Sequence, residues 1–347
     1  MRRPRAPGRP GHLRRGVYLG SVHHPLGRGG LSALVNRAFA AVFPGQGAQY
    51  VGMGGEIAER FPAARTIFER ATAAVGFDVL RLCAEGPEEA LRATANTQPA
   101  ILVTSLACLS TLPTTPELAA GLSLGEYTAL VCAGALLLED AVRLVRLRGF
   151  FMEEATAGRE TMMTAVLGLS PDQAREVCAT HAHLGVVEPS NFNSPGQVVI
   201  GGDMAAVREV MAAARAMGAR RAVPLAVSAP FHTSLMRPAA ERLAAEVERV
   251  PIFDASIPVV VNASAQPVRR VREIRQALID QVASPVLWEA TVRAIADRGI
   301  RRFVEIGPGT TLSGMIRKTV PAASIAHVED AASREDALAM LAAEPVP

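Results

Sequence analysis

The chain has 347 residues, of which 49% are hydrophobic, 20% charged and 4% aromatic. This hydrophobic content is enough to bury a core, which excludes general disorder, and the length indicates about two structural units. The longest apolar run spans only residues 129–138, whereas a membrane-spanning helix needs about 20 apolar residues, so we expect no membrane span.

The net charge of +3 hides an uneven distribution. Residues 1–40 contain eight arginines and no acidic residue, which leaves 28 basic and 33 acidic residues in the rest of the chain. An Arg-rich segment without acids is typical of an organellar transit peptide or a nucleic-acid tail. We interpret residues 1–37 as a disordered basic extension, with a transit peptide as the alternative. Because the segment has neither interleaved aromatic residues nor a known binding module, we expect no nucleic-acid partner.

The cysteine and histidine spacing indicates no metal site and no disulfide framework. The four cysteines form no C-x-x-C pair and have no histidine at ligand spacing. His181 and His183 have no acidic or cysteine partner at metal spacing, so we interpret them as exposed residues at a helix end. We therefore expect no metal and no cofactor, and the reduced thiols together with the missing secretory signal favour the cytoplasm.

The first predicted element is a buried strand over residues 38–43, which enters a tight turn at Pro44-Gly45-Gln46-Gly47. The apolar periodicity of the following segment predicts one short strand and several helices. The strand covers residues 118–122, and the helices cover residues 57–75, 87–91, 100–112, 126–136 and 138–155.

The pattern of predicted elements changes over residues 159–228. Strands are predicted over residues 162–169, 185–190, 198–201 and 219–227, and helices over residues 171–180 and 204–217. This β-α-β-β-α-β order is the ferredoxin-like pattern, and it indicates a subdomain inserted into a larger α/β domain.

The larger domain then comprises residues 38–158 and 229–330. Its second part contains predicted helices over residues 235–247, 271–282 and 285–297 and predicted strands over residues 257–262 and 303–306. We interpret residues 331–347 as a C-terminal tail.

The strongest chemical signal is the motif Gly121-Leu122-Ser123-Leu124-Gly125 between a predicted strand and a predicted helix. The glycines allow a sharp turn from strand to helix, so that the serine Oγ projects and the helix N-terminus offers N–H groups. In this context Ser123 is a candidate nucleophile.

A nucleophilic serine needs a base. Of the seven histidines, only His232 lies in a loop between a predicted strand and a predicted helix; the others lie in the basic extension, on the predicted subdomain surface or near the C-terminus. A structural loop histidine is the alternative interpretation. Several acidic residues lie between Ser123 and His232, and none carries a clear signature of a third triad member.

Six motifs follow one another along the chain. They are Phe43-Pro44-Gly45-Gln46-Gly47-Ala48-Gln49, Gly121-Leu122-Ser123-Leu124-Gly125-Glu126-Tyr127, Arg148-Gly149, Asn191-Phe192-Asn193-Ser194-Pro195-Gly196-Gln197, Phe231-His232 and Glu305-Ile306-Gly307-Pro308-Gly309. Together they resemble the malonyl-CoA:acyl-carrier-protein transacylases of fatty acid biosynthesis. The resemblance implies an α/β-hydrolase-like core with an inserted ferredoxin-like subdomain.

The resemblance also implies roles for individual residues. Ser123 corresponds to the acylated nucleophile and His232 to its general base, oriented by a main-chain carbonyl at Gln281. Gln46 and the N–H of Leu124 correspond to the oxyanion hole, and Arg148 to the residue that binds the malonyl carboxylate. Asn191 and Asn193 resemble residues at the mouth of the site, although the turn Asn193-Ser194-Pro195-Gly196 would need them anyway.

Two positions bear on acyl selectivity. Phe231 resembles the malonyl-selecting members, whereas methylmalonyl-selecting relatives have a small residue there. Leu122 departs from the family, which usually has histidine before the nucleophile, and its effect on the acyl site stays open.

The expected substrates are malonyl-CoA and acyl carrier protein, and we expect a monomer. We expect docking of the acidic carrier to use basic residues such as Arg269, Arg270, Arg272 and Arg275, although a solvated helix face explains them as well. A discrete acyltransferase that serves a polyketide synthase carrier is the nearest alternative. A thioester hydrolase is a weaker one, because it would be expected to lack Arg148.

Overall fold

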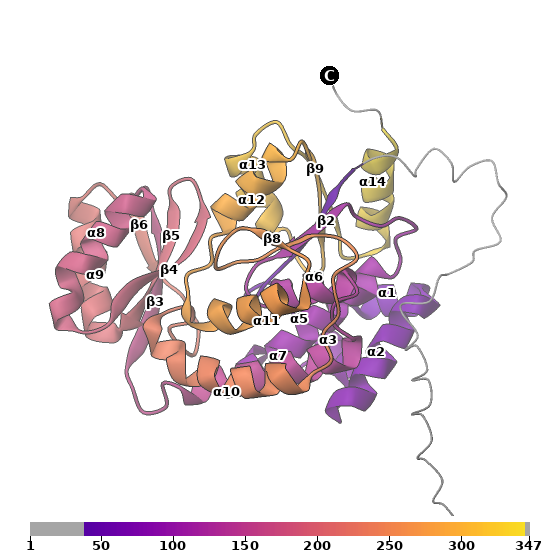
Figure 1. Ribbon diagram of the computed structural model, residues 1–347, viewed down its shortest axis with the longest axis horizontal. Helices are drawn as coiled ribbons and strands as arrows, with labels where there is room; N and C mark the ends of the chain where they lie inside the picture. Colours follow the sequence, from indigo (N-terminus) through magenta and orange to yellow (C-terminus); the bar gives the residue numbers. More distant parts are fainter. Residues whose placement is uncertain (1–37, 344–347) are drawn as a thin grey trace, which may run out of the picture.

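The computed structural model describes residues 38–343, and the basic extension predicted over residues 1–37 lies outside them. A six-stranded sheet in the order β10-β9-β1-β2-β7-β8 forms the centre of the larger unit (Figure 1). All neighbouring strands are parallel except β7 and β8. The strands are β1 (Ala40–Phe43), β2 (Leu118–Gly121), β7 (Val259–Val260), β8 (Pro267–Val268), β9 (Arg302–Ile306) and β10 (Ser324–Val328).

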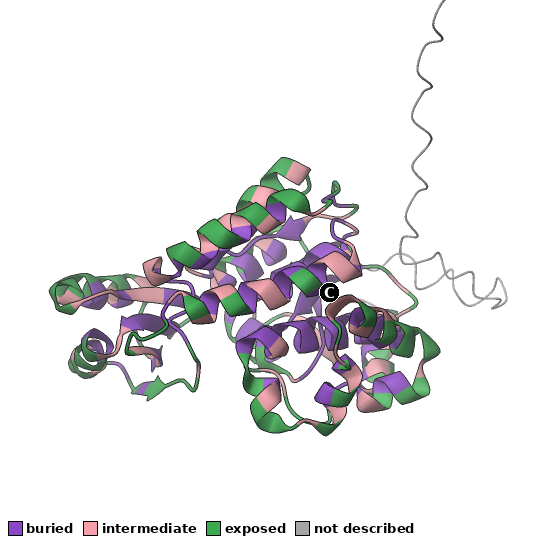
Figure 2. Ribbon diagram, turned by 90° about the horizontal axis from the view of Figure 1, so that it is seen from below, coloured by how far each residue is buried: buried purple, intermediate pink, exposed green. Residues whose placement is uncertain are grey.

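Both faces of this sheet are covered, as the short and continuously apolar strands predict. Alternate residues of β1 belong to two different cores: Ala41 and Phe43 pack into one, and Ala40 and Val42 into the other. The first core contains residues of the larger set of helices, and the second contains residues of α12 (Trp288–Asp297) and α13 (Thr311–Thr319). Figure 2 shows the sheet as buried and the outer faces of the helices as exposed.

The larger set of helices lies mostly before the insertion in the sequence. It comprises α1 (Gly55–Arg60), α2 (Pro62–Val75), α3 (Val79–Glu85), α4 (Glu88–Arg92), α5 (Thr94–Leu109), α6 (Gly125–Cys132), α7 (Leu138–Glu154), α10 (Arg237–Arg249), α11 (Val271–Asp280) and α14 (Ala331–Ala342). Short 3-10 turns cover Ala182–Leu184, Ser234–Met236 and Gln281–Ala283. Among residues 38–343, none of the helices is long and apolar enough to cross a membrane.

The smaller unit is a four-stranded antiparallel sheet in the order β4-β5-β3-β6. Its helices α8 and α9 pack on one face and bury a separate apolar core (Figure 1). The elements are β3 (Thr161–Leu167), α8 (Pro171–His181), β4 (Val187–Ser194), β5 (Gln197–Asp203), α9 (Met204–Ala216) and β6 (Arg221–Pro224). The predicted α/β class is confirmed, and the elements between α7 and α10 follow the predicted β-α-β-β-α-β order.

The structure adds α3, α13, β8 and β10, which the sequence analysis did not predict, and it corrects two predictions. The helix expected over residues 57–75 is split at Phe61, because Pro62 lacks an N–H and begins a new helix. The predicted C-terminal tail is wrong over its first part, where Ala331–Ala342 forms α14. The Asp330 carboxylate caps this helix by accepting from the Ser333 N–H, and Leu341 is buried in the main core.

Candidate active site

Ser123 lies at the turn between β2 and α6, with a left-handed backbone φ of 54°. The two flanking glycines make this turn possible. A Cβ on Gly121 would lie 2.0 Å from the Gly125 carbonyl carbon, and a Cβ on Gly125 would lie 2.1 Å from the Phe43 oxygen. The motif therefore produces the strained elbow that its sequence predicts.

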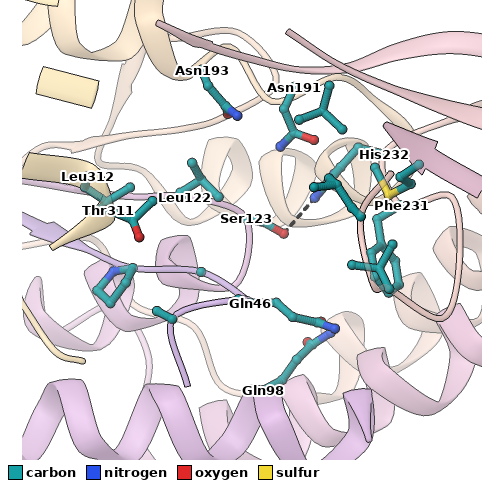
Figure 3. A pocket seen from close by; sticks show the side chains of 18 of the residues that line it. Gln46, Gln98, Leu122, Ser123, Asn191, Asn193, Phe231, His232, Thr311 and Leu312 are labelled. Atoms are coloured by element: carbon teal, nitrogen blue, oxygen red, sulfur yellow. Dashed lines mark hydrogen bonds between the residues drawn. The ribbon is translucent and has the colours of Figure 1, made fainter. Parts of the chain in front are cut away.

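His232 reaches Ser123 from the loop between β6 and α10 (Figure 3). Its Nε2 lies 2.7 Å from Ser123 Oγ, and its Nδ1 lies 2.9 Å from the Gln281 main-chain oxygen. Because a carbonyl only accepts, Nδ1 carries the proton, and Nε2 is left to accept from the serine hydroxyl. Gln281 thus occupies the place that a carboxylate takes in other triads.

The imidazole of His232 is held in its neutral form. The side chain is 3% exposed and its φ of 61° is also left-handed. Burial lowers its pKa from 6.5 to about 3, and the positive charge of Arg148 adds to this effect. A neutral imidazole with its free nitrogen toward Ser123 can accept a proton.

Arg148 on α7 places its guanidinium beside the serine. Its Nη2 donates to Ser123 Oγ at 3.0 Å and to Gln281 Oε1 at 3.0 Å, and its Nη1 donates to Gln98 Oε1 at 2.9 Å. The Arg148 side chain is 2% exposed, and its Nε has no hydrogen-bond partner among the described residues. The guanidinium forms no ion pair with any acidic residue between 38 and 343. The guanidinium also lies 5.6 Å from the centre of the Tyr127 ring, and the charge of Glu126 reaches it without an ion pair. A buried cation that hydrogen-bonds only to neutral oxygens favours binding of an anion.

Gly149 explains how Arg148 comes so close. A Cβ at this position would lie 2.7 Å from Ala95 Cα and 2.8 Å from the Ala95 nitrogen, in the first turn of α5. The glycine therefore lets α7 pack directly on the backbone of α5, which also carries Gln98.

A cavity of about 210 Å³ opens at Ser123 between the core and the subdomain. Gln46, Asn191, Asn193 and Phe231 all line it, together with Ser123, His232 and Arg148. The rest of the wall is mainly apolar and includes Leu122, Met152, Met163, Val199, Leu225, Val227, Leu312 and Met315. Figure 3 shows Asn191 and Asn193 on one side of Ser123 and Gln46 and Gln98 on the opposite side.

Leu124 and Gln281 contribute from behind the cavity wall. The Leu124 side chain is buried in the core, whereas its N–H finds no acceptor among the described residues. The Gln281 side chain is fully buried, and its Nε2 donates to the Ser123 carbonyl at 2.9 Å.

Two site residues escaped the sequence analysis. Gln98 binds Arg148, and Asn262 accepts from the Ser123 N–H at 2.6 Å. Neither belongs to a glycine-containing motif, and both are amides in otherwise ordinary segments. Their only signal is a polar residue at the edge of an apolar run, which is typical of a buried polar contact but does not identify the partner.

The arginines considered for carrier docking are mostly occupied. Arg269 and Arg275 donate to main-chain oxygens of neighbouring loops, and Arg270 forms an ion pair with Asp254 at 2.7 Å. These contacts favour the interpretation of a solvated helix face. Within residues 38–343, no group of three or more His, Cys, Asp or Glu side chains is arranged to hold a metal ion.

The fold and the site together define an acyltransferase. The chain matches the family described as the acyl transferase domain over residues 41–338. The malonyl CoA-acyl carrier protein transacylase of Salmonella typhimurium is 43% identical over 304 residues, which cover 86% of this chain and 98% of that protein. Its counterpart in Bacillus subtilis is 43% identical, with 80% and 89% covered. The protein therefore belongs to the family of malonyl CoA-acyl carrier protein transacylases.

Solved structures agree with this assignment. The malonyl CoA-acyl carrier protein transacylase from Coxiella burnetii matches with a TM-score of 0.86 and 38% identity, covering 88% of this chain and 98% of that one. A malonyl-transacylase in complex with the acyl-carrier protein of a type II polyketide synthase matches with a TM-score of 0.84 and 42% identity, covering 87% and 99%.

Proposed function

We propose that this protein transfers the malonyl group of malonyl-CoA to the phosphopantetheine thiol of acyl carrier protein, through a malonyl ester of Ser123, in fatty acid biosynthesis. The observation that carries the proposal is one cavity in which Ser123 contacts both a neutral His232 and an unpaired Arg148. The first contact supplies an acyl-accepting nucleophile, and the second supplies a binding site for a carboxylate.

In the first half-reaction, His232 Nε2 takes the hydroxyl proton as Ser123 Oγ attacks the thioester carbonyl carbon. The tetrahedral intermediate then collapses, the carbon–sulfur bond breaks, and the CoA sulfur leaves with the proton from Nε2. The second half-reaction reverses these steps with the carrier thiol: it loses its proton to Nε2 and attacks the ester, and the free Ser123 hydroxyl is restored.

Negative charge develops on the acyl oxygen in both half-reactions. The free N–H of Leu124 at the start of α6 is one donor for this oxyanion, and Gln46 on the opposite wall supplies the other. Asn191, Asn193 and Phe231 shape the mouth on the subdomain side, where the pantetheine arm enters.

Arg148 selects a dicarboxylic acyl group. Its guanidinium fork matches the two oxygens of a carboxylate, and Gln98 and Gln281 hold it in place through their side-chain oxygens. A bound malonyl carboxylate gives this buried cation a direct ion-pair partner, whereas Glu126 acts on it only at longer range.

The alternative to a fatty-acid carrier as the physiological acceptor is a polyketide carrier. The similarity to a malonyl-transacylase of a type II polyketide synthase supports a polyketide carrier as acceptor, with the same chemistry at Ser123. Transfer rates to a fatty-acid carrier and a polyketide carrier, measured side by side, distinguish the two. We also propose a monomer in the reducing cytoplasm, which the four unpaired cysteines fit.

The test is the intact mass of the protein after incubation with malonyl-CoA. We expect the mass to rise by one malonyl unit, located on a peptide that contains Ser123, and we expect Ser123→Ala to remove the increase. A malonyl group on any other residue would refute the assignment.

A further inference from the structure

Asn262 follows β7 and is fully buried behind the elbow. Its carboxamide spans the turn that carries the nucleophile. Nδ2 donates to the Gly121 oxygen at 2.7 Å, and Oδ1 accepts from the Ser123 N–H at 2.6 Å. A single side chain from a distant segment therefore binds both sides of the turn, directly before and after Leu122.

Asn262 is itself held from two directions. Its own N–H donates to Glu126 Oε2 at 2.6 Å, and its Oδ1 accepts a second hydrogen bond from Gln281 Nε2 at 3.3 Å. Glu126 is fully buried in the first turn of α6, immediately after the elbow. The amide thus has a fixed orientation with donor and acceptor in defined places.

The backbone of Ser123 needs such support. A left-handed φ at a residue other than glycine is strained, and it persists only where the surroundings over-determine it. The N–H of Ser123 is bound by Asn262, and its carbonyl accepts from the Gln281 side chain. These two bonds set the direction of Oγ toward His232 and leave the next N–H, that of Leu124, free of any described acceptor.

We infer that Asn262 is a positioning residue for acylation. Its carboxamide holds the Ser123 backbone in the reactive orientation, so that Oγ remains in line with His232 Nε2 and the Leu124 N–H faces the developing oxyanion. The inference rests on the proposed function, since it concerns the same reaction. It assigns to the elbow a partner that lies outside the glycine motif.

The experiment compares Asn262→Ala with Asn96→Ala in the full chain. Asn96 is a matched control: its Nδ2 donates to the Ala90 oxygen at 2.9 Å, and it does not contact the elbow. Misplacing a reacting group by about 1 Å costs on the order of 100-fold in rate. We expect Asn262→Ala to lower the maximal rate of malonyl-Ser123 formation by about 10- to 100-fold, with the half-saturating malonyl-CoA concentration changed by less than about threefold. We expect Asn96→Ala to keep the wild-type rate.

Asn262→Asp supplies a readout that a purely structural role would not change. A protonated carboxyl at this position offers an O–H to the Gly121 oxygen and a C=O to the Ser123 N–H, which reproduces the amide. An ionised carboxylate has no proton to donate, so it places an acceptor against the Gly121 oxygen, which is also an acceptor. The titratable or charged groups nearby are Glu126 on α6, and Arg148 and the neutral His232 beyond Gln281 and Ser123. The rate of Asn262→Asp relative to wild type should therefore rise as the pH falls.

Thermal unfolding of each variant shows whether it is folded at the assay temperature. The inference would be overturned by an Asn262→Ala variant that acylates at the wild-type rate. It would also be overturned by an Asn262→Asp variant whose rate relative to wild type does not change with pH. A loss that appears only in the half-saturating concentration would overturn it as well. Failure of the wild type to accept a malonyl group would instead refute the proposed function, so the two failures are distinguishable.

Discussion

The guanidinium of Arg148 and the hydroxyl of Ser123 are in direct contact, with 3.0 Å between Nη2 and Oγ. In a malonyl ester of Ser123, a single methylene group separates the carboxylate from the carbonyl carbon that is bonded to Oγ. An acyl group on Ser123 therefore has its carboxylate within reach of the same guanidinium. The residue that we propose to select the acyl group and the atom that we propose to carry it are therefore neighbours.

Replacing Arg148 should separate malonyl from acetyl transfer. Arg148→Ala leaves the malonyl carboxylate without a partner in a partly desolvated cavity, at a cost of roughly 3–5 kcal/mol. We expect the acylation rate with malonyl-CoA to fall by about two to three orders of magnitude, since about 1.4 kcal/mol corresponds to a factor of ten. Acylation with acetyl-CoA should hold steady or rise, because acetyl has no carboxylate. Equal losses with both substrates would make Arg148 structural.

The acylation rate should persist to a lower pH than it would with a general base of ordinary histidine pKa. A protonated His232 cannot accept the Ser123 proton, so activity is lost as the pH falls through its pKa. Burial and Arg148 lower that pKa to about 3, and the maximal acylation rate should therefore stay constant from about pH 8 to about pH 5, where a histidine with an ordinary pKa of about 6.5 would be mostly protonated. Intact-mass kinetics across this range measure it. Because burial raises the pKa of Glu126 to about 7, the same profile is measured on Glu126→Gln. A decline centred near pH 6.5 in both proteins would contradict the pKa shift of His232.

The close packing of α7 on α5 should depend on Gly149. Gly149→Ala places a methyl group 2.7 Å from Ala95 Cα, and such overpacking typically costs about 1–3 kcal/mol. We expect a lower free energy of unfolding in denaturant titrations and a larger loss of malonyl than of acetyl transfer, because Arg148 moves with the helix. Gly314→Ala is a control for the substitution itself, since Gly314 is also helical and a Cβ there meets no atom within 4 Å. A Gly149→Ala protein with wild-type stability would show that the helices adjust without cost.

Much of the site was predictable because several of its reactive groups belong to short sequence motifs. Gly121 and Gly125 are needed for the steric reason that the structure shows, and a serine between them at the end of an apolar strand predicts an exposed nucleophile. His232 could be chosen because few histidines lie in a loop that follows a strand. The alternation of strands and helices, with a β-α-β-β-α-β stretch in the middle, likewise predicted the fold class.

The contacts around the nucleophile could be decided only by the tertiary structure. Asn262 reaches Ser123 across 139 positions and Arg148 reaches Gln281 across 133, and no local pattern records which buried amide meets which backbone group. The missed helix α14 has the same cause, since its alanine-rich sequence gives a weak periodicity and its place is decided by packing on β10. The sequence by itself determined the chemical groups and the local turns that present them. The tertiary structure decided their partners, because burial pairs each polar group with whatever distant segment the fold brings beside it.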